Sequence, residues 1–235
     1  MNQNPSSIKP LLSIIIPVLN ENDILTTLVD SLACYRQCDN AEVIFVDGGS
    51  TDGTVACLDS EQLYCITSAC GRATQMNAGA AQASGSIVLF LHADTRLPFI
   101  RPEHLLQRMQ QTKCKWGRFD ISISGNGPWF PVISWAMNLR SRLTGVATGD
   151  QALFIEKQCF KQLRGFALQP LMEDIEISKR LRQISRPLCL KKRVITSGRR
   201  WQQGGVIKTI LLMWRLRLAY WLGQNPEHLA RLYHN

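Results

Sequence analysis

Several common patterns are missing from this chain. No two of its eight cysteines are separated by two residues, which argues against a zinc site and favours buried thiols over disulfides in a reducing compartment. The first ten residues are polar with a single charge and do not resemble a signal peptide, so we expect a cytoplasmic protein. The apolar run at 206–222 contains three cations and is a poor membrane span.

Acidic residues are scarce toward the C-terminus. The chain has 27 Lys and Arg against 18 Asp and Glu, a net charge of +9, and no acid occurs between Ile177 and Pro226. A cationic block of this kind calls for an anionic partner, either a diphosphate or an acidic membrane surface. Nucleic acid is excluded, because no zinc-finger, RRM-like or helix-turn-helix pattern accompanies the charge.

The sequence does contain apolar runs that alternate with helical spacing. Continuous apolar runs at 12–18, 41–47 and 86–92 are typical of strands buried on both faces, and 63–67 is a weaker strand. Helical spacing or composition falls between them, at 22–34 and 71–83. This order predicts an α/β fold with a doubly wound, mostly parallel sheet. Further along we expect strands at 116–122 and 152–155, a loop at 125–131, and helices at 135–143, 173–182 and 206–222.

Polar clusters follow three of the predicted strands, at Asn20-Glu21, 47–52 and 92–95. Ligands of such sheets bind beyond the carboxyl ends of the strands, so we expect the site there. A nicotinamide-dependent oxidoreductase would carry G-x-G-x-x-G after the first strand, where this chain has PVLNEND. A nucleotidyltransferase would also need a Gly-rich loop at that place. Both classes are therefore rejected.

Seven segments carry a resemblance to the family 2 glycosyltransferases with the GT-A fold, in matching order over residues 12–201. They are SIIIPVLNE (13–21), VDGGSTDGT (46–54), GRATQMNAGA (71–80), FLHADT (90–95), GDQALFI (149–155), LMEDIEISKRL (171–181) and SGRRW (197–201). The FLHADT, GDQ and RRW variants are similar to a small bacterial branch of that family. The resemblance implies an enzyme that moves a sugar, most simply a hexose, from a nucleotide-diphosphate sugar to an acceptor hydroxyl with inversion.

The same resemblance implies a division of the chain. Residues 11–202 would form the catalytic domain, with a nucleotide-sugar half at 11–96 and an acceptor half at 97–202. A helical segment at 203–235 would follow.

On the donor side, the resemblance assigns Asp47 to the nucleobase or its ribose, since a carboxylate can accept from a base N–H or two hydroxyls. Relatives often have a second acid where this chain has Gly48. The same pocket would be lined by Pro17, Leu19 and Glu21, whereas Asp52 is expected to cap the next helix. Residues implied at the donor phosphates are Arg72, Asn77, Arg199 and Arg200.

The metal is expected at Asp94. A leaving diphosphate needs Mn²⁺ or Mg²⁺, which bind through one or two carboxylates, phosphate oxygens and water. The family pattern is Asp-x-Asp, and here His92 replaces the first acid. His92 is expected to bind the donor ribose, to orient Asp94, to favour Mn²⁺, or only to pack at the strand end.

The general base is expected at Asp174, with Glu173 beside it. In an inverting transfer one carboxylate takes the proton of the attacking hydroxyl, and adjacent acids raise each other's pKa. Asp150, Gln151 and Trp201 are expected on the acceptor side. The acceptor itself is left open between a sugar, a lipid-linked molecule and a terpenoid.

One alternative is a non-catalytic protein that binds a nucleotide sugar or an acidic membrane surface. His92, Gly48 and the basic C-terminal half favour it. The helix at 206–222 is expected either to dock on the domain or to lie in a membrane interface, on the inner face of the membrane.

Overall fold

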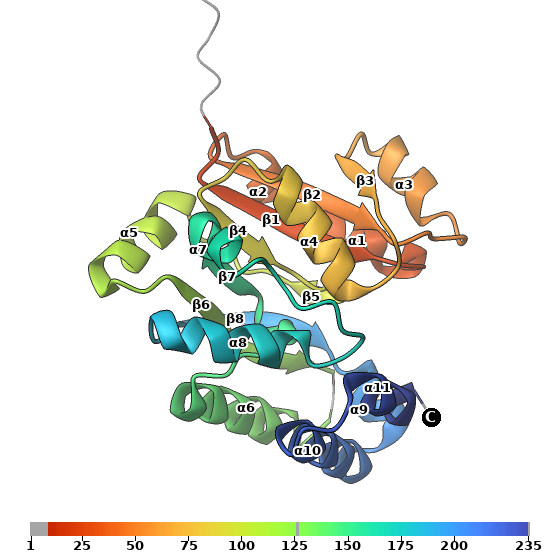
Figure 1. Ribbon diagram of the computed structural model, residues 1–235. Coiled ribbons are helices and arrows are strands. Elements are labelled where there is room, and N and C mark those ends of the chain that lie inside the picture. Colours follow the sequence, from red (N-terminus) through yellow and green to blue (C-terminus); the bar gives the residue numbers. More distant parts are fainter. Residues whose placement is uncertain (1–8, 126, 235) are drawn as a thin grey trace, which may run out of the picture.

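The computed structural model describes residues 9–125 and 127–234. Its centre is an eight-stranded sheet with the strand order β3-β2-β1-β4-β7-β6-β8-β5 (Figure 1). Four of the seven pairings are parallel and three are antiparallel. The predicted mostly parallel α/β fold is therefore confirmed.

The N-terminal half is the parallel part of the sheet. Its strands are β1 (Leu12–Val18), β2 (Ala41–Asp47), β3 (Cys65–Thr67) and β4 (Ile87–Phe90). Its helices are α1 (Asn22–Ser31), α2 (Ala33–Arg36), α3 (Thr54–Ser60) and α4 (Arg72–Gln82). The strands predicted at 12–18 and 41–47 are confirmed to the residue. The helix expected over 22–34 is interrupted at Leu32 and continues as α2.

The C-terminal half adds the antiparallel strands. They are β5 (Thr95–Arg96), β6 (Trp116–Ser124), β7 (Leu153–Glu156) and β8 (Leu188–Ser197), of which β6 and β8 pair in parallel. The helices are α5 (Pro102–Thr112), α6 (Phe130–Thr144), the 3₁₀ turn η1 (Gly149–Gln151), α7 (Lys157–Gln162), α8 (Glu173–Ile184), α9 (Arg199–Gly204), α10 (Val206–Trp221) and α11 (Pro226–His234).

One boundary predicted in this half is wrong, and one strand was missed. The loop expected to reach residue 131 ends earlier, because α6 begins at Phe130 with Pro131 in its first turn, where a missing N–H costs nothing. Strand β8 was not predicted at all. Its middle carries three consecutive exposed cations, residues 191–193, which hide the apolar pattern on either side.

Helices cover both faces of the sheet (Figure 1). Alternate residues of β1 divide between two cores, since Ile14 and Ile16 pack with α1 and α5 while Ile15 packs with α4 and α8. Gly79 of α4 lies against Ile15 and Val46 so closely that a Cβ there would collide with both. The helix is thereby fixed directly on the strands whose ends face the site.

The C-terminal helices dock on α6 and on each other. Val206 and Ile210 of α10 pack with Phe130 and Ile133 of α6, and Leu216 packs with α11. Within the described ranges, no helix is long and apolar enough to cross a membrane.

Candidate functional site

A cavity of about 550 Å³ opens where the parallel strands end. Its walls come from α6, η1, the start of α8, the end of β8, and helices α9, α10 and α11. Seven of the residues predicted from the sequence line it: Arg72, His92, Asp94, Asp150, Glu173, Asp174 and Trp201. The cavity therefore unites residues from the donor, metal, base and acceptor predictions.

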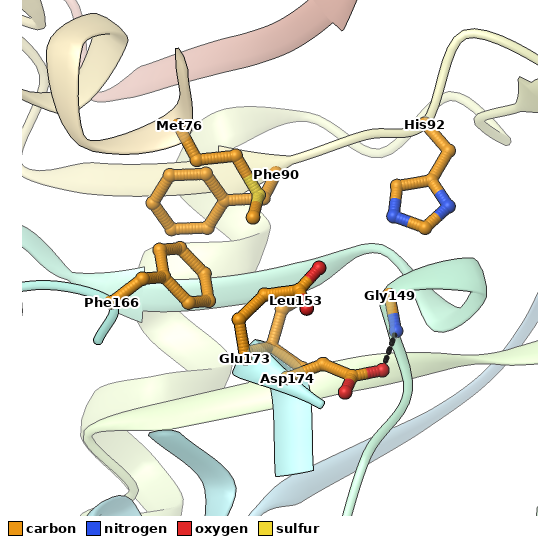
Figure 2. A pocket seen from close by; sticks show the side chains of 8 residues that line it. All are labelled: Met76, Phe90, His92, Gly149, Leu153, Phe166, Glu173 and Asp174. Atoms are coloured by element: carbon orange, nitrogen blue, oxygen red, sulfur yellow. Dashed lines mark hydrogen bonds between the residues drawn. The ribbon is translucent and has the colours of Figure 1, made fainter. Parts of the chain in front are cut away.

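Asp174 is held by main-chain N–H groups at the start of α8. Its Oδ2 accepts a hydrogen bond of 2.8 Å from the amide of Gly149, and its Oδ1 accepts one of 2.7 Å from Ile175 (Figure 2). The side chain is partly exposed to the cavity. A fixed carboxylate of this kind can accept a proton from a hydroxyl bound in the cavity.

The carboxyl group of the neighbouring Glu173 lies in a different environment. It is only 6% exposed, and burial, followed by the charge of Asp174, raises the pKa of Glu173 from 4.5 to about 7. Figure 2 places it beside Phe166 and Phe90, on the apolar side of the pair. The two carboxyl groups are thus distinguished by environment, with Asp174 as the accessible one.

His92 and Asp150 form a second linked pair. The Nδ1 atom of His92 lies 3.2 Å from Oδ1 of Asp150. Desolvation opposes ionisation of Asp150, but the hydrogen bond with His92 and the charges of Arg72 and Arg217 outweigh it, so its pKa is lowered. Gly149 lies directly under the His92 ring, where any Cβ would collide with it (Figure 2). Glycine at 149 therefore lets Asp174 and His92 approach the same turn.

Asp94 shares its surroundings with Glu21, Arg72 and Arg199. Burial and then the charge of Asp94 raise the pKa of Glu21, while Arg199 and Arg72 lower it. The carboxylate of Asp94 accepts a hydrogen bond of 3.3 Å from the Thr95 hydroxyl and otherwise faces the cavity. Two acids and two arginines thus meet where a diphosphate would need both its charge and its metal balanced.

No set of three or more His, Cys, Asp or Glu side chains within the described ranges is arranged to hold a metal ion. A single cavity-facing carboxylate nevertheless fits Mg²⁺ or Mn²⁺ at a diphosphate, since most of the ligands of such an ion come from phosphate and water. Asp94 meets that requirement.

The predicted nucleobase pocket lies outside the cavity. Asp47 is buried, and its carboxylate accepts hydrogen bonds from the amides of Gly49 (2.8 Å) and Ser50 (3.1 Å). Pro17 and Leu19, at the end of β1, are not among the cavity-lining residues. The amide of Gln75 in α4 bridges the carbonyls of Val18 and Val46 and so holds the two strand ends together.

The remaining predicted residues have mainly local contacts. Asn77 exchanges two hydrogen bonds of 2.9 Å with the main chain of Phe166 and does not line the cavity. Gln151 is buried, and its Oε1 accepts a hydrogen bond of 3.2 Å from the amide of Thr148. The Asp52 carboxylate accepts from the amides of Asn22 and Thr54, the first residues of α1 and α3. The side chain of Arg200 lies outside the described residues.

Two charged residues of the cavity were not predicted as site residues, Arg140 of α6 and Arg217 of α10. The signal in the sequence was an arginine within an otherwise apolar helical face. That pattern also fits a surface residue, and only the packing of α6 beside α10 brings the two together.

The α/β fold and the acidic cavity at its strand ends define a GT-A-type protein. The chain belongs to the Glycosyl transferase family 2, whose family model matches residues 13–169. It is 37% identical over 98 residues to a PGL/p-HBAD biosynthesis glycosyltransferase of Mycobacterium bovis, which covers 37% of each chain. It is also 30% identical over 141 residues to an uncharacterized glycosyltransferase of Mycobacterium tuberculosis, covering 58% of this chain and 48% of that one. The chain thus spans half or less of these relatives.

Solved structures show the same fold. Staphylococcus aureus TarS in complex with UDP superposes with a TM-score of 0.63 at 19% identity, over 79% of this chain and 60% of that one. The mannosyltransferase PcManGT of Pyrobaculum calidifontis, in complex with GDP-Man and Mn²⁺, superposes with a TM-score of 0.59 at 18% identity, over 97% and 69%.

Proposed function

We propose that this protein is an inverting glycosyltransferase that uses a nucleotide-diphosphate sugar, with Asp174 as the general base. The observation that carries the proposal is the Gly149–Asp174 contact, which fixes an accessible carboxylate in the same cavity as Asp94 and Arg72. The nucleotide complexes of the structural neighbours support the donor class.

In this scheme Asp174 accepts the proton of the acceptor hydroxyl while that oxygen forms its bond to the anomeric carbon. The bond from the anomeric carbon to the β-phosphate oxygen breaks on the opposite side, and the electron pair leaves with the nucleoside diphosphate. Arg72 and Arg199 balance the charge of that leaving group, because guanidinium groups pair bidentately with phosphate. Glu173, whose pKa is raised to about 7, is mostly protonated below pH 7 and lies on the apolar side of the pair, which leaves Asp174 as the carboxyl group that faces the cavity.

Asp94 would hold Mn²⁺ or Mg²⁺ on the diphosphate. The ion supplies charge stabilisation for the leaving group when it is bound. His92 is turned toward Asp150, and we assign it to positioning that acid rather than to the metal.

The donor and metal assignments are tested by thermal unfolding with UDP-, GDP- and dTDP-sugars, with and without Mn²⁺. The true donor should raise the unfolding midpoint of the protein by mass action. This rise should occur only when Mn²⁺ is present. Asp94→Ala should abolish the metal-dependent shift, whereas Asp30→Ala, at an exposed site on α1, should retain it. An unchanged shift in Asp94→Ala would contradict the assignment.

We also propose that the protein lies on an acidic membrane surface through α6 and α10. On α10 the exposed apolar residues recur at helical spacing along one face: Ile207, Leu211, Trp214, Leu218 and Trp221. On α6 a matching face exposes Trp129, Val132, Trp135, Leu139 and Leu143. Lys208 and Arg215 are exposed on α10 as well, which suits anionic lipid. Trp129, Val132 and Trp214 also line the cavity, so it opens toward this surface.

A further inference from the structure

Arg140 of α6 and Arg217 of α10 line the cavity, and both side chains are half-buried. Nε and Nη2 of Arg140 are buried and have no hydrogen-bond partner. In the part of the chain that the structure describes, neither guanidinium forms a salt bridge. Arginine stays charged, and buried donors left unpaired destabilise a fold, so an anion that pairs with these donors would account for the arrangement.

The two arginines also repel each other. Burial, then the charge of Arg217, lowers the pKa of Arg140 to about 10, and burial lowers that of Arg217. Asp174 attracts both, yet it uses its own oxygens for the amides of Gly149 and Ile175. A bound anion would relieve the repulsion and accept the free N–H groups together.

Their place relative to Asp174 identifies which substrate the anion belongs to. Arg72 and Arg199 act on Glu21 beside Asp94, which is the donor side. Arg140 and Arg217 come from α6 and α10, the helices that wall the cavity beside Asp174, whereas Arg72 and Asp94 come from the parallel half of the sheet. Since a general base must reach the acceptor hydroxyl, we assign the second pair of arginines to the acceptor.

The helix that carries Arg140 is held firmly in this orientation. Asn138 of α6 accepts from the amide of Ile121 (2.9 Å) and donates to its carbonyl (3.0 Å), and Ser134 accepts from the amide of Ile123 (3.1 Å). These bonds dock α6 on β6 and leave Arg140 facing the cavity. The packing of α6 on β6 therefore keeps the Arg140 side chain exposed to the cavity.

The wall next to the two arginines is apolar. It is made by Trp129, which precedes α6, by Val132, Ile133 and Met137 of α6, and by Met213 and Trp214 of α10. An acceptor that fills this space needs an apolar body as well as an anionic group. A free sugar offers neither.

We propose that Arg140 and Arg217 form an anion-binding subsite for the acceptor, which is an amphiphile that carries a phosphate group near its reactive hydroxyl. This rests on the proposed function, because it takes Asp174 as the base for that hydroxyl. The phosphate belongs either to a lipid headgroup or to a soluble phosphate ester, and the two sources differ in the apolar body.

The test is calorimetric titration of the full chain with dihexanoyl phosphatidylglycerol and, separately, with glycerol 3-phosphate. The wild type should bind saturably, and Arg140→Met and Arg217→Met should each weaken binding by roughly tenfold or more, the scale of a lost charged hydrogen bond. Arg108→Met is the matched control, since Arg108 is exposed on α5 and does not line the cavity. Tighter binding of the lipid than of glycerol 3-phosphate supports an amphiphile with a lipid headgroup, and equal binding would contradict the apolar part of the proposal.

A second measurement separates a binding role from a structural one. Without ligand, Arg140→Met should raise the unfolding midpoint, because it removes a buried charge with unpaired donors. A lowered midpoint together with unchanged binding of both phosphate compounds would overturn the subsite. Binding of UDP or GDP with Mn²⁺ is measured in parallel. Its absence in the wild type would count against the proposed function alone, whereas a wild type that binds nucleotide but neither phosphate compound would count against the subsite alone.

Discussion

At the scale of single residues, Glu173 and Asp174 show how one helix start produces two different carboxyl groups. Asp174 accepts two amide N–H groups at the cavity, while Glu173 is buried among aromatic side chains. Adjacent acids in the sequence suggested a raised pKa for the base. The structure gives the raised pKa to Glu173 instead, and burial is its main cause.

Glu173 should make stability depend on pH. Its folded pKa of about 7 lies above its ordinary value of 4.5, so the folded state holds the proton more tightly. The stabilisation that comes from this tighter proton binding is fully present below pH 4.5 and is lost as the pH rises toward 7. Glu173→Gln cannot ionise, so its free energy of unfolding relative to wild type should rise by roughly 3 kcal/mol across this window. Urea unfolding at several pH values measures the difference, and a difference that is constant with pH would refute the shift.

Gly149 is expected to tolerate no side chain. In Gly149→Ala the new Cβ would collide with the His92 ring and displace it from Asp150. Donor turnover should fall by about tenfold or more, a cost typical of a displaced active-site group. A double-mutant cycle with His92→Ala provides the control. If the collision with the His92 ring is the cause, Gly149→Ala should lower turnover little further in the His92→Ala background. Fully additive losses of turnover would show that the damage has another origin.

At the scale of elements, the sequence predicts best those strands whose own residues form a recognisable apolar run. Strands β1 and β2 are buried on both faces, so their apolar runs locate them to the residue. Strand β8 is partly exposed and charged, and its place between β6 and β5 depends on pairings that no local pattern shows. The same holds for Arg140 and Arg217, which meet only because α6 packs on α10.

The exposed face of α10 gives the element-scale prediction. Leu211→Glu places an acid on that face, outside the cavity lining, and should weaken binding to vesicles of equal parts phosphatidylcholine and phosphatidylglycerol by roughly tenfold. Leu168→Glu is the control, because Leu168 is also exposed but lies in the loop before α8. Cosedimentation at low and high salt measures both variants, and wild-type binding should be released by salt. Absence of wild-type binding at low salt would exclude the membrane proposal.

At the scale of the whole molecule, the parallel half supplies the strand ends and the C-terminal half closes the cavity over them. Asp94 and Arg72 come from the first part, Asp174 and Asp150 from the second. Motifs predicted these residues singly, because each follows a recognisable strand or precedes a helix. The walls could not be predicted, since α6, α10 and α11 approach one another only in the folded chain.

The central claim is that Asp174 acts as the base in sugar transfer. It is tested most directly by release of nucleoside diphosphate from the donor identified by thermal unfolding, measured for wild type, Asp174→Asn and the exposed control Asp30→Asn, with donor affinity determined alongside. Asp174→Asn should bind the donor as wild type does and release product ~10²-fold more slowly, the usual scale for a lost general base, while Asp30→Asn stays unchanged. Near-normal release by Asp174→Asn would contradict the account.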